Sequence, residues 1–516
     1  MSSTMLQPSD AQISYHEPSL PSLLTLLSFL YLLNIFRSIA SYLLNAGLLG
    51  EIAIGIIYGP VAKILPLEWE QTFLVLGYIG LVLIVFEGGL TLDVKGFLPL
   101  LPIAFGSALV GILLPLAFTF ALFSAPSYGY PTIEAFTAGS ALASTSLGTT
   151  FFVLKSAAEG GGGGGGSGGN LEETRIAMVL KGAALIDDIV ALVLLSVISS
   201  LGEGEGGGTG GGLGWTIGRP IVASLAMCLV TPIVLVFVLK PLFGMKLVRG
   251  WMEKGGKEVK LGLGVLVLSA YLAIAYYAGT TVLLGSFLAG LTLPFLSAPS
   301  SSSSPSFLDT YQLYIEPLQT YILVPFFFGS IGYSIPFLEL WTGQIVWKGI
   351  VYSILMLLGK LLVGGCIVLN DLILPPKAPT GGGTKSGKEE EKNSSTSTPT
   401  NTLAERGSHD KESLPLSTPS STERTRRETF MKETLPASAF LGTALVARGE
   451  IGILVLQVAY NSSSSSSSNS TRVLGTEAYL VSIWAVTICT ILGPIGFGRL
   501  VKSRWGREGV MRGKWN

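Results

Sequence analysis

Two adjacent carboxylates interrupt a long apolar stretch of the sequence. Asp187 and Asp188 lie near the middle of KGAALIDDIVALVLLSVI, residues 181–198. In the core of a bilayer each ionised acid costs about 2.5–3.5 kcal/mol on insertion scales. Because a helix turns by about 100° per residue, the two acids face different directions. We therefore expect one acid to form an ion pair and the other to be open to water, where it could bind a proton or a cation.

A lysine in another apolar stretch is the expected partner of the paired acid. Lys360 lies near the middle of SILMLLGKLLVGG. One ion pair needs only one acid, which leaves the second acid available for a proton or a monovalent cation. The alternative, in which these groups are only structural ion pairs between helices, stays open. His16 and His409 fall outside the apolar runs, so we expect no transition-metal site and no cofactor, only Na⁺ or K⁺ at the acids.

Two further segments carry residues that favour an interrupted helix. One is ASTSLGTT, residues 143–150, which is crowded with hydroxyls, and the other is VARGEIG, residues 446–452. Unwound backbone there would expose helix ends whose dipoles and carbonyls complement an ion, although small residues can equally serve close packing. We expect the two interrupted helices to cross near the middle of the membrane. The residues expected at this crossing are Thr145, Ser146, Gly148, Arg448, Gly449 and Glu450.

The elements that must position these residues are membrane helices. The chain of 516 residues is 49% hydrophobic and only 13% charged, about half the charge of a soluble domain. Many apolar runs reach the roughly 20 residues that cross a hydrocarbon core. The pattern predicts an all-α polytopic membrane protein with about thirteen spans, near 21–41, 43–63, 71–91, 97–123, 131–155, 172–200, 217–242, 259–278, 279–297, 311–335, 343–370, 436–460 and 474–499.

Composition divides the chain into five parts. A segment rich in Ser, Thr, Pro and charge interrupts the spans and predicts a disordered cytoplasmic insert. The parts are a polar N-terminal tail at 1–20, spans 1 to 11 at 21–370, the insert at 371–433, spans 12 and 13 at 434–500, and a basic cytoplasmic tail at 501–516.

The distribution of basic residues predicts the orientation. Most of the 33 Lys and Arg follow odd-numbered spans or lie in the C-terminal tail. The positive-inside rule then places the C-terminus in the cytoplasm and the N-terminus outside. The glycosylation sequons at Asn461 and Asn469 fall on the outer side, as such sites require, and a third at Asn393 falls in the cytoplasm and should be silent.

Span 7 separates six helices from six, so the two halves enter the membrane in opposite orientations. LLGEIAIG, residues 48–55, matches LLGSFLAG, residues 283–290, in the second helix of each half. Together with the helix count, this match favours two inverted-topology repeats of the transporter type.

The ordered set of motifs resembles the monovalent cation:proton antiporters, specifically the bacterial-type sodium/proton antiporters with a paired aspartate. The motifs cover about 43–460 without the inserts, and the glycine and serine runs depart from the family only in loops. They are AALIDDIVALVLL, LLGEIAIGIIYGP, GLVLIVFEGGLTLD, ALASTSLGTT, LLGSFLAGLTLP and VARGEIGIL.

The resemblance implies a homodimer of thirteen-helix protomers, each with a dimerisation domain and a mobile core domain that contains two discontinuous crossing helices. It implies that Asp188 carries the cation and the proton, and that Asp187 pairs with Lys360. The implied function is exchange of a monovalent cation for protons by alternating access, with Na⁺ favoured over Li⁺ or K⁺. Neither enzymatic activity nor a nucleic-acid partner is expected, and the plasma membrane and an endomembrane remain open.

Two other functions stay open at this stage. A cation channel lined by the same acids would need a continuous pore and no proton coupling. A sensor that no longer transports would not need both an intact acid pair and a membrane lysine.

Overall fold

In the computed structural model, every element of the described chain is a helix. The structure describes residues 17, 19–44, 46–92, 96, 98–146, 174–203, 213–246, 248, 250–251, 255–296, 306–373, 430–462, 472–503 and 505. Large apolar side chains project outward from many of these helices, including Leu229, which is 71% exposed, and Phe237, which is 75% exposed. Helices that are apolar on their outer faces are typical of proteins surrounded by lipid.

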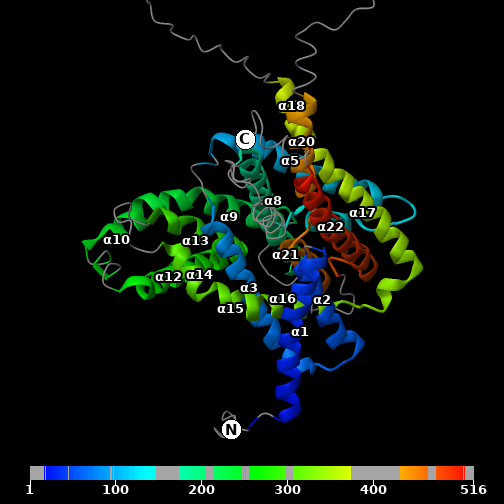
Figure 1. The fold of residues 1–516 in the computed structure, drawn as a ribbon, viewed down its shortest axis with the longest axis horizontal. Helices are drawn as coiled ribbons and strands as arrows, with labels where there is room; N and C mark the ends of the chain where they lie inside the picture. Colours follow the sequence, from blue (N-terminus) through cyan, green and yellow to red (C-terminus); the bar gives the residue numbers. More distant parts are fainter. Residues whose placement is uncertain are drawn as a thin grey trace, which may run out of the picture.

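The helices form two groups that pack mainly within themselves. In the first, the α8 bundle, α17 packs on α5 and α22, and α21 packs on α6 and α8. Figure 1 shows α17, α20 and α22 at the right of this group and α8 near the centre. Its members are α5 (Leu101–Phe123), α6 (Thr132–Ala143), α8 (Arg175–Glu203), α17 (Gly343–Val363), α18 (Gly365–Ile373), α20 (Leu435–Ala444), α21 (Glu450–Asn461) and α22 (Thr476–Lys502).

In the second group, the α3 bundle, α13 packs on α3 and α12, and α2 packs on α1 and α16. In Figure 1, α9, α10 and α12–α14 lie to the left of α8, and α1 points downward. Its members are α1 (Leu20–Leu44), α2 (Gly47–Ile56), α3 (Leu67–Leu90), α10 (Lys240–Gly244), α12 (Gly256–Ala278), α13 (Val282–Thr292), α14 (Phe307–Tyr314), α15 (Glu316–Leu318) and α16 (Val324–Ser334). Helix α9 (Leu213–Val234) packs on α8 and on α13, and so lies between the two groups.

Short 3₁₀ or π-helical segments extend several of the α-helices. The 3₁₀ turns are η2 (Leu98–Leu100), η5 (Leu293–Leu296) and η7 (Glu339–Trp341), and the π turns are η1 (Ile57–Val61), η4 (Leu235–Leu239), η6 (Gln319–Leu323) and η8 (Phe430–Thr434). Pro60 lies in η1 and Pro294 in η5. Because proline has no N–H to donate, each of these helices leaves regular α geometry close to its proline.

Eight helices of the described chain are long and apolar enough to cross a membrane, and together they confirm a polytopic membrane protein. They coincide with expected spans 1, 3, 4, 6, 7, 8, 11 and 13. The other five expected spans fall on shorter helices such as Gly47–Val61, Val282–Leu296 and Glu450–Asn461. Thirteen spans therefore remains a prediction. At the expected insert 371–433, α18 runs on to Ile373 and η8 begins at Phe430, and residues 374–429 lie outside the described residues.

The matching glycine motifs make reciprocal contacts between the two halves of the chain. A Cβ on Gly55 of α2 would lie 2.2 Å from the carbonyl oxygen of Gly329 on α16. In the equivalent position of the other half, a Cβ on Gly290 of α13 would lie 2.1 Å from the carbonyl oxygen of Phe86 on α3. In each case the second helix of one half rests directly on the third helix of the other.

A second reciprocal pair lies three residues further along the third helices. A Cβ on Gly332 would lie 2.2 Å from the carbonyl oxygen of Ile52, and a Cβ on Gly89 would lie 2.2 Å from that of Phe287. Ile52 and Phe287 occupy the same position of the two matching motifs. This exchange of partners supports the inverted repeat, because a two-fold relation requires each contact to occur twice.

Candidate functional site

Two stretches without helical structure meet in the middle of the α8 bundle. The first, Ser144–Ser146, follows the end of α6 at Ala143, where Ser144 adopts an extended conformation. The second separates α20, which ends at Ala444, from α21, which begins at Glu450. The backbone N–H of Ser146 donates a hydrogen bond of 2.9 Å to the carbonyl oxygen of Ala447. This hydrogen bond joins the two interrupted segments.

A glycine permits this close approach. A Cβ on Gly449 would lie only 2.7 Å from the Cβ of Ser146, well inside the contact distance of two carbon atoms. Glu450 is the first residue of α21. Gly148, the remaining residue expected at the crossing, lies outside the described residues.

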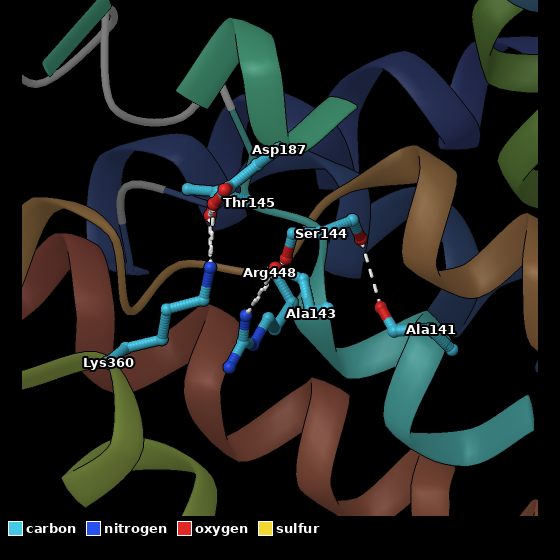
Figure 2. Close-up of polar contacts among 7 residues, drawn as sticks. All are labelled: Ala141, Ala143, Ser144, Thr145, Asp187, Lys360 and Arg448. Atoms are coloured by element: carbon cyan, nitrogen blue, oxygen red, sulfur yellow. Dashed lines mark hydrogen bonds and ion pairs between the residues drawn. The ribbon is translucent and has the colours of Figure 1, made fainter. Parts of the chain in front are cut away.

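Asp187, Lys360 and Thr145 form a buried network beside the crossing (Figure 2). The Lys360 ammonium donates to Asp187 Oδ2 at 2.7 Å and to Thr145 Oγ1 at 3.0 Å, and Thr145 Oγ1 donates to Asp187 Oδ2 at 2.8 Å. All three side chains are at most 3% exposed. Asp187 comes from α8, Lys360 from α17 and Thr145 from the stretch after α6, so the network ties three elements together.

Asp188, the next residue of α8, is partly exposed and takes no part in this ion pair. Its Oδ1 atom is buried and has no hydrogen-bond partner within the described chain. Its carboxylate is repelled by Glu450 and Asp187 and attracted by the ammonium of Lys360. An acid held near two other acids, with an unused oxygen atom, is suited to bind a cation or a proton.

Arg448 lies fully buried between the two interrupted segments (Figure 2). Its Nη1 donates to the carbonyl oxygens of Ser144 at 2.9 Å and of Ala143 at 3.5 Å. These carbonyls end α6, where the helix dipole is negative, so the guanidinium compensates that end of the dipole. Thr490 of α22 donates to the carbonyl oxygen of Arg448 at 3.0 Å and holds this segment in place.

Two neighbours of the site could not be predicted from the sequence. Gly111 of α5 lies against the Lys360–Asp187 pair, and Thr490 supports Arg448. Neither residue carries a charge or breaks a pattern, so only the arrangement of the helices reveals them. The sequon residue Asn461 is exposed at the end of α21, away from the crossing, and Asn469 lies outside the described residues.

The family model for the transmembrane sodium/hydrogen exchangers matches residues 24–375 of the chain. The chain belongs to the sodium/hydrogen exchanger family. The resemblance inferred from the motifs is thereby confirmed, and with it an integral, multi-pass membrane protein from a family of cation/proton antiporters. The matched residues include Asp187, Asp188 and Lys360, whereas the segment from Arg448 to Glu450 lies beyond them.

Individual relatives agree with the family. The chain is 24% identical over 318 residues to the probable Na⁺/H⁺ antiporter GerT of Bacillus cereus, a match that covers 61% of this chain and 74% of GerT. It is 27% identical over 228 residues to the high-affinity Na⁺/H⁺ antiporter NhaS3 of Synechocystis, covering 43% of this chain and 44% of NhaS3. These relatives are transporters rather than enzymes.

The fold is also similar to solved structures. Two structures of the sodium proton antiporter MjNhaP1 from Methanocaldococcus jannaschii match with TM-scores of 0.52 and 0.55 at 13% and 14% identity. The matches cover 94% and 93% of this chain and 100% and 96% of the solved chains. At this level of identity the similarity concerns the fold, which confirms the all-helical membrane architecture.

Proposed function

We propose that this protein exchanges Na⁺ for protons, and that Asp188 is the carboxylate that binds each of them in turn. The observation that carries this proposal is the difference between the two acids. Lys360 and Thr145 both donate to Asp187 Oδ2, whereas no residue of the described chain donates a hydrogen bond to Asp188. The Oδ1 atoms of both acids lack a hydrogen-bond partner there, so the two acids differ at Oδ2. The ion pair fixes the geometry of one acid and leaves the other to the ions.

Competition for Asp188 suffices for antiport. A single carboxylate holds a proton or a cation but not both well, and the repulsion from Glu450 makes the empty site unfavourable. Crossing of the membrane by the empty, charged site would be costly, which couples the two ion movements. Na⁺ is the proposed cation because GerT and NhaS3 are named for it; Li⁺ and K⁺ are outcomes of the test.

Alternating access would require the α8 bundle to move against the α3 bundle. Much of the surface between them is apolar, including Leu192 and Leu195 of α8 and Leu284 of α13. Ser196 of α8 makes polar contacts across this surface. Its hydroxyl accepts a hydrogen bond from the backbone N–H of Thr281 at 3.0 Å, and it lies 3.4 Å from the hydroxyl of Thr280. Apolar surfaces can slide, whereas these hydrogen bonds must break during movement.

A cross-link tests this movement. Cysteines in place of Ser196 and Thr280 should react with a short bifunctional thiol reagent and arrest exchange, and reduction of a cleavable link should restore it. A matched pair within the α3 bundle, at Ser334 of α16 and Glu70 of α3, whose side-chain oxygens lie 3.2 Å apart, should link without arresting exchange. Full exchange by protein linked between Ser196 and Thr280 would contradict the proposed movement.

The activity itself is tested with purified protein in liposomes that carry a preset pH gradient. Addition of Na⁺ should dissipate the gradient, and substitution of Li⁺ or K⁺ for Na⁺ should reveal the order of preference. Large passive conductance without proton movement would instead indicate a channel. Absence of both, with correctly inserted protein, would indicate a sensor without transport.

The proposal includes an arrangement in the membrane. We place the N-terminus outside and the C-terminus in the cytoplasm, following the basic residues, and expect the protein to form a homodimer.

A further inference from the structure

Helix α5 crosses the buried ion pair at a glycine. A Cβ on Gly111 would lie 3.3 Å from the Lys360 ammonium nitrogen and 3.6 Å from each carboxylate oxygen of Asp187. The backbone of α5 therefore covers both partners of the ion pair at once. The distance of 3.3 Å to the ammonium nitrogen is shorter than ordinary van der Waals contact. A methyl group at position 111 would therefore press on the ammonium.

The ion pair has little freedom to yield. Lys360 is 0% exposed, and its ammonium is held by Asp187 and Thr145. Helix α17 also approaches α5 closely at the preceding residue, because a Cβ on Gly359 would lie 3.3 Å from the ring of Phe118. Small residues on both helices thus set the distance between α5 and α17, as is common where membrane helices cross closely.

We propose that Gly111 is a positioning residue for the reaction: its missing side chain lets α5 hold the Lys360 ammonium against Asp187. A methyl group at this position displaces the ammonium from the carboxylate. Because a buried ion pair depends on close geometry, the displacement alters the charge that Asp188 experiences from its neighbours. The expected effect of the methyl group on transport rests on the proposed role of Asp188. The expected effect on the Lys360–Asp187 ion pair does not depend on that role.

The chain offers a matched control on the same helix. A Cβ on Gly106 of α5 has no atom within 4 Å. Gly111→Ala and Gly106→Ala make the same change in helix propensity, and only the first meets the ion pair.

A double-mutant cycle on thermal unfolding tests the contact without any transport measurement. Gly111→Ala should lower the melting temperature of the otherwise unchanged protein by several degrees, and by less than half of that shift in the Lys360→Gln background. Gly106→Ala should change the melting temperature equally in both backgrounds. Folding of Gly111→Ala only in the Lys360→Gln background would also support the contact. Equal shifts in the two backgrounds, or failure to fold in both, would overturn it.

The effect on transport is a separate readout. Gly111→Ala should move the pH of half-maximal Na⁺-driven proton flux by at least about half a unit, because a change of one unit corresponds to about 1.4 kcal/mol of differential interaction. Gly106→Ala should leave the profile in place. The thermal cycle could show coupling while Gly111→Ala leaves the pH profile of the flux unchanged. That result would overturn the positioning role and leave Gly111 with only a packing contact. Absence of flux in the unmodified protein would contradict the proposed function, while the thermal cycle still decides the contact.

Discussion

The backbone N–H of Ser146 and the carbonyl oxygen of Ala447 are joined by a hydrogen bond of 2.9 Å, although 300 residues of sequence separate them. Ser146 follows the end of α6, and Ala447 lies between α20 and α21. Backbone groups freed by such interruptions must find partners inside a membrane protein. Here they find each other, and Thr145, Arg448 and Asp187 lie beside them (Figure 2).

Removal of the buried guanidinium should weaken this crossing. Arg448→Met takes away the donor to the carbonyl oxygens of Ser144 and Ala143. Hydrogen bonds to charged groups contribute about 1.5–3 kcal/mol, so we expect the free energy of unfolding to fall by about that amount. Denaturant unfolding in detergent measures it. The exposed Arg219 provides the control, and a similar loss in Arg219→Met would contradict the role assigned to Arg448.

Some of this site could be predicted from the sequence. Charged residues inside apolar runs of a membrane protein are costly wherever they lie. Asp187, Asp188 and Lys360 could therefore be predicted as site residues from the sequence alone. The turn of about 100° per residue separated the directions of the two acids. The glycine and the charges at 448–450 marked the interruption between α20 and α21.

Other features depend on how helices cross, which local patterns do not encode. Nothing in the sequence of α5 indicates that Gly111 covers an ion pair, because the contact requires α5, α8 and α17 to meet at one level. The partner of Arg448 could not be predicted either. It is the backbone carbonyl of Ser144, and every residue has such a carbonyl, so no residue type marks it. Helix lengths also differ from expectation, because Pro60 and Pro294 lie where two short helices change to other turns.

Lys360→Gln should change both stability and charge movement. Loss of the ammonium leaves Asp187 without its ion-pair partner, and breaking a buried pair is strongly destabilising, by about 3–5 kcal/mol. If Lys360 releases a proton when the cation binds, two protons exchange for one cation, and the variant should become electroneutral or inactive. Flux at imposed membrane potentials measures this charge movement.

The control for Lys360 lies on the same helix. Lys348 is buried and pairs with Glu477 at 2.7 Å. Lys348→Gln should lower stability while the exchange keeps its voltage response. An unchanged stoichiometry and voltage response in Lys360→Gln would rule out proton carriage by Lys360 and leave a structural tether.

The orientation makes a prediction about glycans. Expressed in a eukaryotic cell, the chain should be modified at Asn461 or Asn469, which the positive-inside rule places on the outer side, and Asn461 is exposed. Mass spectrometry of the purified protein identifies the site, and Asn461→Gln with Asn469→Gln provides the control. A glycan on Asn393 would reverse the topology.

Asp188 is the residue on which the proposed mechanism depends, and the most direct test is Na⁺-driven proton flux through Asp188→Asn in liposomes. The amide keeps the size of the side chain but does not exchange a proton near neutral pH. We expect the flux to be lost while the protein stays folded and inserted, and the exposed carboxylate of Glu68 provides the matched control, Glu68→Gln, with full flux. Normal Na⁺-driven proton flux through Asp188→Asn would contradict the proposed mechanism.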